Sequence, residues 1–198
     1  MAMIMAWPEG QEGVAEDDAA VIERSWADVA EFATVYDRHA ATIHRYLARR
    51  AGGQLADDLT GETFLAALRQ RRRYDLGHRS ALPWLYGIAT NLLRRHRRTE
   101  VRQYRAFARS GVDPVTESHA EAVSARVAAA AVTRELAAAL ADLPADQRDV
   151  LLLLAWGQMT YEEIATALGI PIGTVRSRLS RARGKVRAAL TDLTEEDS

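Results

Sequence analysis

Cysteine is absent from all 198 residues of the sequence. The chain can therefore form neither a disulfide framework nor a thiolate metal site. Its five histidines are scattered without the spacing of metal ligands. We therefore expect no metal and no cofactor, and the absence of cysteine fits a protein of a reducing cytoplasm.

Long apolar runs are missing as well. No stretch approaches the roughly 20 apolar residues that a membrane-spanning helix needs. The short apolar start has no basic segment before it and is followed at once by the acidic stretch EGQEGVAEDDAA, which is not the pattern of a secretory signal. The sequence therefore predicts a soluble, cytoplasmic protein that does not act at a membrane.

A strong overall charge is also lacking, since 26 basic and 27 acidic residues leave a formal net charge of −1. The two signs are nevertheless segregated along the chain. Acidic residues gather at 9–18 and 195–197, whereas arginines gather in two internal blocks, 69–109 and 176–187. The average charge therefore conceals strongly basic local surfaces.

What the chain does contain is helical periodicity. Apolar residues recur at steps of three and four from Trp26 onward, and no segment alternates for long enough to form a strand. The pattern predicts helices from Trp26 to the AGGQ turn at 51–54, over 55–72 and, beginning at Pro83, over 84–102. The stretch SGVDPVTESHAE at 110–121 has the composition of a linker.

The predicted fold class is all-α, with two small helical domains joined by a flexible linker. We expect five segments with the following bounds: a disordered acidic tail at 1–25, a helical domain at 26–108, the linker at 109–134, a second helical domain at 135–192, and an acidic tail at 193–198.

A helix-turn-helix is predicted in the second domain. Thr160 and Glu163 have the spacing of a capping box, so a helix should begin there, and Gly169 should end it. IPIG then turns the chain into a second helix. Its apolar positions, which should face inward, are Val175, Leu179, Ala182 and Val186.

The opposite face of that second helix is basic. Positions 176, 177, 180, 181 and 183 point away from the apolar face, and no acid occurs between Gly169 and Val186. Like charges at this spacing repel one another by a few tenths of a kcal/mol each, whereas DNA phosphates would reverse that sign. Arginine also forms bidentate bonds to guanine in the major groove, so we predict a surface that binds duplex DNA.

The other basic block interleaves arginines with aromatic residues, including Tyr74, Trp84, Tyr86 and Tyr104. Single-stranded nucleic acid needs this combination, because its backbone attracts cations and its unstacked bases require flat partners. Packing in the core is the alternative for Trp84 and Tyr86 individually.

Before both basic blocks, at residues 55–68, lies the acidic stretch LADDLTGETFLAAL, with Asp57, Asp58 and Glu62 near the start of a helix. Acids there complement the helix dipole, which alone would explain them. Asp58 and Glu62 are four residues apart, however, and a like-charge pair on one face also suggests a basic protein partner.

Taken together, these motifs resemble the RNA polymerase sigma factors of the extracytoplasmic-function group of the sigma-70 family. DDLTGETFLAALR resembles their region 2.2, PWLYGIATNLLRRHRR resembles regions 2.3 and 2.4, and the sequence from LPADQRDVLLLL to RARGKVRAAL resembles region 4. The resemblance covers about residues 27–105 and 135–190.

The resemblance implies a promoter-specificity subunit that is not an enzyme and has no catalytic residues. Its implied partners are core RNA polymerase (the β′ clamp helices and the β flap), promoter DNA in duplex and single-stranded form, and an anti-sigma factor. The residues implied in core binding are Asp57, Asp58, Glu62 and Phe64. Those implied at the −10 element are Tyr74, His78, Arg79, Ser80, Trp84, Asn91, Arg94, Arg95 and Arg98. Those implied at the −35 element are Thr174, Arg176, Ser177, Arg178, Ser180, Arg181 and Arg183.

Two positions depart from the family pattern. Gly61 stands where the family usually has glutamine, and GHRSALP differs from the commoner form of the base-capturing loop.

Two other functions remain open. A helix-turn-helix regulator of duplex DNA would leave the region 2 motifs unused. A single-strand nuclease would need clustered carboxylates or a poised base, and the sequence offers only one acidic helix start.

Overall fold

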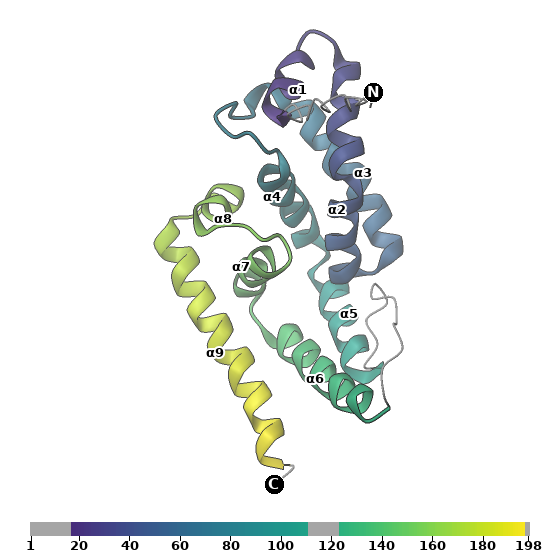
Figure 1. The fold of residues 1–198 in the computed structure, drawn as a ribbon, viewed down its shortest axis with the longest axis vertical. Coiled ribbons are helices and arrows are strands. Elements are labelled where there is room, and N and C mark those ends of the chain that lie inside the picture. Colours follow the sequence, from purple (N-terminus) through teal and green to yellow (C-terminus); the bar gives the residue numbers. More distant parts are fainter. Residues whose placement is uncertain (1–16, 111–122, 197–198) are drawn as a thin grey trace, which may run out of the picture.

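The computed structural model describes residues 17–110 and 123–196, and within these ranges it is helical and contains no strand. This confirms the predicted all-α class. The helices form two bundles (Figure 1). The first contains α1 (Asp18–Arg24), α2 (Ala33–Ala51), α3 (Gly53–Gln70), α4 (Leu82–Leu93) and α5 (Arg97–Ser110); the second contains α6 (Val123–Asp142), α7 (Ala145–Ala155), α8 (Tyr161–Leu168) and α9 (Ile172–Glu196).

The first bundle is built around aliphatic side chains at helical spacing. Ile43 and Leu47 from α2, Leu59 from α3, and Leu85 and Leu93 from α4 are at most 1% exposed. The AGGQ turn separates α2 from α3 as expected, and Gly52 there has φ +86°, a conformation that glycine adopts readily.

Residues 17–25, predicted as part of a disordered tail, instead form helix α1. Asp17 caps this helix by accepting a hydrogen bond from the Ala20 N–H at 3.0 Å. Val21 and Ile22 are fully buried in the first bundle. The prediction failed here because two apolar residues inside an acidic stretch give too short a pattern to detect, although they suffice to anchor a helix of seven residues. Residues 1–16 lie outside the described residues.

The helix predicted over 84–102 is interrupted. Pro83 stands in the first turn of α4, as expected. A short 3-10 turn at Arg94–His96 then separates α4 from α5. The predicted linker at 109–134 includes the last residues of α5 and the first part of α6, while residues 111–122 lie outside the described ranges.

The helix-turn-helix is formed by α8 and α9. The Thr160 Oγ1 accepts from the Glu163 N–H at 3.2 Å, and the Thr160 N–H donates to the Glu163 carboxylate at 2.7 Å. This is the predicted capping box. Gly169 ends α8 in the left-handed conformation with φ +63°.

The two bundles touch along one side, where α8 lies against α4 and α6 lies against α5 (Figure 1). The helices approach closely at Gly87, since a Cβ added there would lie 2.5 Å from the carbonyl oxygen of Ala167. Glycine is therefore the residue that allows α4 and α8 to meet.

Candidate nucleic-acid interface

The outer face of α9 has the predicted composition. Val175, Leu179 and Ala182 are at most 1% exposed and anchor the helix to its own bundle. Four of the predicted −35 residues are exposed on the other side: Arg176, Ser180, Arg181 and Arg183.

The other three predicted −35 residues are half-buried. The Ser177 hydroxyl donates to the carbonyl of Thr174 at 3.1 Å, inside the helix. Arg178 pairs with Asp146 of α7 at 3.1 Å, which draws its guanidinium toward its own bundle. Of the predicted −35 residues, the exposed four are therefore the ones that face solvent.

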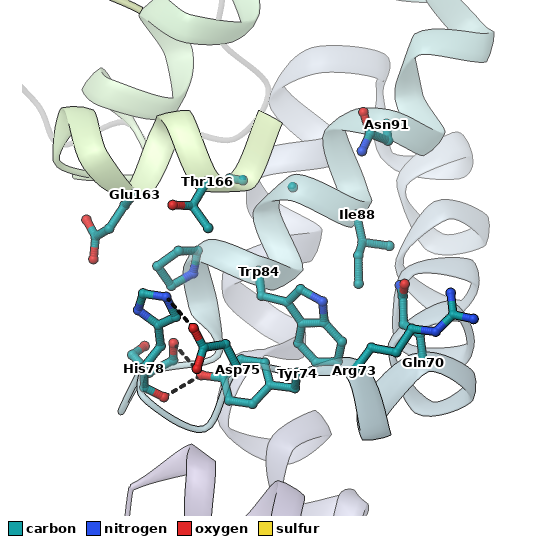
Figure 2. A pocket seen from close by; sticks show the side chains of 14 residues that line it. Gln70, Arg73, Tyr74, Asp75, His78, Trp84, Ile88, Asn91, Glu163 and Thr166 are labelled. Atoms are coloured by element: carbon teal, nitrogen blue, oxygen red, sulfur yellow. Dashed lines mark hydrogen bonds and ion pairs between the residues drawn. The ribbon is translucent and has the colours of Figure 1, made fainter. Parts of the chain in front are cut away.

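A separate cavity of about 320 Å³ lies beside α4. Figure 2 shows the Trp84 indole inside it, with Tyr74 next to it and Arg73 at one edge. The ring centroids of Tyr74 and Trp84 are 5.0 Å apart. From the other bundle, Glu163 and Thr166 of α8 line the opposite wall.

The aromatic residues of this region divide into two kinds. Trp84 is half-buried and lines the cavity, so part of its ring remains accessible. Tyr86 is 2% exposed and packs edge-on against Tyr46 at 5.0 Å, so for Tyr86 the core interpretation holds. Tyr74 is 6% exposed. Burial is the main cause that raises the pKa of its hydroxyl, and the charges of nearby aspartates raise it further, so the hydroxyl stays a hydrogen-bond donor.

The loop before α4 presents three predicted −10 residues, His78, Arg79 and Ser80, all exposed. Asp75 shapes its first turn, because its carboxylate accepts from the Gly77 N–H at 2.9 Å and lies 3.6 Å from the His78 imidazole.

The basic residues at the end of α4 and along α5 are mostly exposed. Asn91, Arg95 and Arg98 face solvent. Arg94 is half-buried, because its Nε donates to the Asp149 carboxylate of the other bundle at 3.1 Å and its Nη1 donates to Asn91 at 3.0 Å. One predicted −10 residue is thus occupied by a contact between the bundles.

The acidic residues of α3 are exposed, as a protein-binding face requires. Asp58 and Glu62 face solvent, and Asp57 does so while pairing with His44 at 2.9 Å. Phe64, which the resemblance implied in core binding, is 5% exposed under Tyr36, with the two rings 4.9 Å apart. Phe64 therefore packs beneath the acidic surface of α3 and is not itself exposed to a partner.

Sequence reasoning missed a cluster of buried charges between the bundles. Arg50 of α2, 1% exposed, donates through its Nε to Glu100 of α5 at 2.6 Å and through its Nη2 to Asp149 of α7 at 2.5 Å. Burial opposes the charged guanidinium, but Tyr46 and the carboxylates of Glu100 and Asp149 outweigh it and raise the Arg50 pKa. Arg50 thus keeps its charge.

Two further arginines join this contact. Arg148 of α7 lies 3.4 Å from the Glu100 carboxylate and stacks over the Tyr104 ring at 5.6 Å. Arg49 of α2 stacks over Trp156 at the same centroid distance. One signal in the sequence was available, since Arg50 continues the inward spacing of Ile43 and Tyr46 along α2.

Among residues 17–110 and 123–196, no three histidine or acidic side chains come together as a metal site. Within the same residues, no helix combines the length and apolarity needed to span a bilayer.

A helix-turn-helix with a basic outer face, together with a separate cavity lined by Tyr74 and Trp84, is the arrangement of a DNA-binding protein. Two family models match it: sigma-70 region 2 over residues 35–103 and sigma-70 region 4 over residues 133–186. The sigma factor CarQ of Myxococcus xanthus is 35% identical over 166 residues, covering 83% of this chain and 92% of CarQ.

ECF sigma factor SigC of Mycobacterium tuberculosis is also 35% identical, covering 78% of this chain and 79% of SigC. The chain therefore belongs to the extracytoplasmic-function group of sigma-70 factors, which are non-enzymatic proteins of transcription initiation.

Solved structures show the same fold. CnrH, solved in complex with the cytosolic domain of CnrY, gives a TM-score of 0.59 at 23% identity and covers 91% of this chain and 99% of that one. RpoE of Bartonella quintana, solved with the anti-sigma factor NepR, gives 0.52 at 24% identity and covers 82% and 95%.

Proposed function

We propose that this sigma factor binds core RNA polymerase, reads the −35 element as duplex DNA and captures one strand of the melted −10 element. The observation that carries the proposal is the presence of two different candidate DNA-binding surfaces in one chain. One is the exposed basic face of α9, and the other is the aromatic cavity that contains Trp84, with the exposed His78 and Arg79 in the loop beside it.

The α9 face suits duplex DNA. A helix of this kind fits the major groove, where arginine recognises guanine through two parallel hydrogen bonds. Arg176 and Arg181 are five residues apart and exposed, and Ser180 adds a hydroxyl that can donate or accept. We assign Arg176, Ser180 and Arg181 to base edges and Arg183 to a phosphate. Arg178 is assigned to a phosphate as well, which requires it to leave Asp146.

The cavity beside α4 suits an unpaired strand. Unstacking a base from duplex DNA costs a few kcal/mol, and stacking on an aromatic side chain returns about 1–3 kcal/mol per base. The half-exposed Trp84 indole supplies a flat partner, and the exposed His78, Arg79 and Ser80 supply polar groups at the rim. Arg95 and Arg98 lie farther along the chain for the backbone or the upstream duplex.

The acidic face of α3 is assigned to the polymerase. Asp58 and Glu62 lie on one exposed side of the helix, and their charge fits a basic partner surface such as the β′ clamp helices, while the second bundle would meet the β flap. By analogy with the RpoE–NepR complex, an anti-sigma factor is the proposed inhibitor.

This function requires the bundles to separate. Elements centred near −10 and −35 are about 25 base pairs apart, or about 85 Å at roughly 3.4 Å per pair. In the structure α8 contacts α4 directly, Arg94 is bound to Asp149, and Glu163 sets a carboxylate at the wall of the strand cavity. The closed arrangement is therefore assigned to the chain without DNA.

The direct test is transcription in vitro with core polymerase on a pool of genomic promoter fragments, followed by sequencing of the RNA. We expect initiation at a subset of promoters that share two separated motifs. If core polymerase does not bind the chain, and the chain alone binds palindromic duplex DNA tightly, a conventional helix-turn-helix regulator is the better assignment.

A further inference from the structure

Helix α1 contacts the loop that carries His78, Arg79 and Ser80, and one side chain makes most of that contact. Asp18 is the first residue of α1, and its side chain is 6% exposed. Its carboxylate accepts from the Ala81 N–H at 2.8 Å, and its own N–H donates to the Arg79 carbonyl at 2.9 Å. The backbone at residues 79–81 is thus held at two points by Asp18.

The carboxylate is itself fixed from α2. Arg38 donates to it through Nη1 at 3.0 Å, and the His39 Nε2 lies 2.7 Å from it. Burial alone would raise the pKa of Asp18, but the hydrogen bonds from His39, the Ala81 N–H and Arg38 outweigh burial and lower it to about 2. The group is therefore an anion throughout the physiological range, and a charged acceptor forms stronger hydrogen bonds than a neutral one.

A second buried group holds the same loop. The Tyr74 hydroxyl donates toward the carbonyl oxygens of His78 and Ser80, at 2.6 and 3.0 Å. Together Asp18 and Tyr74 contact the backbone of each residue from His78 to Ala81. The side chain of Ala81 is fully buried, whereas those of His78 and Arg79 are 55% and 78% exposed. The loop is thus anchored from below while its polar side chains face outward.

We propose that Asp18 is a positioning residue that fixes residues 79–81 so that the loop discriminates among bases of the melted strand. This inference rests on the proposed function, because it assigns the loop to base capture. Asp18 touches no DNA in this role. It acts by holding the loop backbone in one conformation before the strand arrives, which reduces the ordering that binding would otherwise require.

Asp18→Asn tests the role with little change in volume. An asparagine has one acceptor oxygen in place of two and gains an NH2 group, so it cannot accept from both Arg38 and Ala81 while facing His39. Asp37→Asn is the matched control, because it makes the same change at an exposed residue of α2. Asp17 cannot serve as the control, since its carboxylate accepts from Arg79 of the loop at 3.4 Å.

The assay is transcription by the reconstituted holoenzyme on templates in which the melted segment and the upstream duplex element are randomised separately. For Asp18→Asn we expect base preference in the melted segment to fall by about ten- to a hundredfold, the range for losing a buried hydrogen-bond partner. Preference in the upstream element should stay unchanged, and Asp37→Asn should match the wild type at both elements. A general folding defect would instead reduce RNA yield without changing either preference.

Tyr74→Phe provides a second variant, since it removes the other anchor of the loop and retains the ring beside Trp84. It should weaken the same preference selectively. If Asp18→Asn and Tyr74→Phe initiate with wild-type base preference, the positioning role is wrong while the proposed function stands. If the wild-type holoenzyme never initiates, the proposed function fails first.

Discussion

Asp149→Arg should separate the two bundles while leaving each of them folded. The Asp149 side chain is 2% exposed and lies between Arg50 and Arg94, both of which belong to the other bundle. An arginine in its place would set a third cation against these two. Removing one partner from a buried ion pair costs about 3–5 kcal/mol, and the like charge adds to that cost.

The cost falls on the closed arrangement alone. When the bundles separate, Arg50 keeps Glu100 from its own bundle, and water reaches the position of residue 149. Since about 1.4 kcal/mol corresponds to a tenfold change, the ratio of closed to separated molecules should fall by about a hundredfold or more. The freed Arg94 should also raise the affinity of the chain without polymerase for single-stranded DNA.

The absence of native cysteine makes the measurement simple. Cysteines introduced at the exposed positions Gln54 of α3 and Ala188 of α9 would carry the two dyes for resonance energy transfer. We expect lower transfer efficiency for Asp149→Arg, with an unchanged circular dichroism spectrum. Asp142→Arg, the same substitution at an exposed residue of α6, is the matched control and should leave transfer unchanged. Equal transfer in wild type and Asp149→Arg would refute the role assigned to the charge cluster.

Four further outcomes are expected. Gly87→Ala should also lower energy transfer, because its Cβ would meet Ala167, while alanine favours helix α4 by about 0.5–1 kcal/mol and so does not weaken the first bundle. Arg176→Ala should cost about 1–3 kcal/mol of base discrimination in the upstream element, measured by competition binding, with polymerase binding intact. Glu62→Arg should weaken binding to core polymerase in a pull-down and leave base discrimination in the upstream element intact. The pKa of Asp18 is lowered to about 2, so the stability that the ionised Asp18 contributes is present above about pH 4 and is lost as the pH falls through 2. The free energy of unfolding, measured in urea, should therefore favour wild type over Asp18→Asn by about 2 kcal/mol less at pH 2 than at pH 5.

The helix-turn-helix could be predicted because local chemistry determines it. Thr160 and Glu163 are three residues apart, and their reciprocal hydrogen bonds require nothing from the rest of the chain. Gly169 terminates α8 for an equally local reason. The inward face of α9 follows from spacing alone, so the exposure of Arg176 and Arg181 was predictable too.

The contacts that the sequence does not disclose are the long-range ones. Arg50 and Asp149 are 99 residues apart, and no local pattern indicates which of many arginines is buried. Asp18 meets Ala81 across 63 residues, and in the sequence it looks like one more acid in an acidic tail. Phe64 lies beside the acidic face in the sequence but packs beneath Tyr36, because helix rotation rather than proximity decides burial.

The charge cluster fits a contact that must open. Apolar side chains of both bundles also join one hydrophobic cluster, but further apolar groups in place of the charges would enlarge the patch exposed to water on separation, whereas arginine and carboxylate groups are well solvated there. Among the described residues, the Tyr104 hydroxyl and the Nε atoms of Arg49 and Arg148 are buried without a hydrogen-bond partner. Such a group costs about 1–3 kcal/mol while it is buried, and separation removes that cost. The ion pairs of Arg50 stabilise the closed arrangement, and the unpaired buried atoms destabilise it. The free energy of binding polymerase and DNA therefore needs to exceed only the difference between these two contributions to separate the bundles.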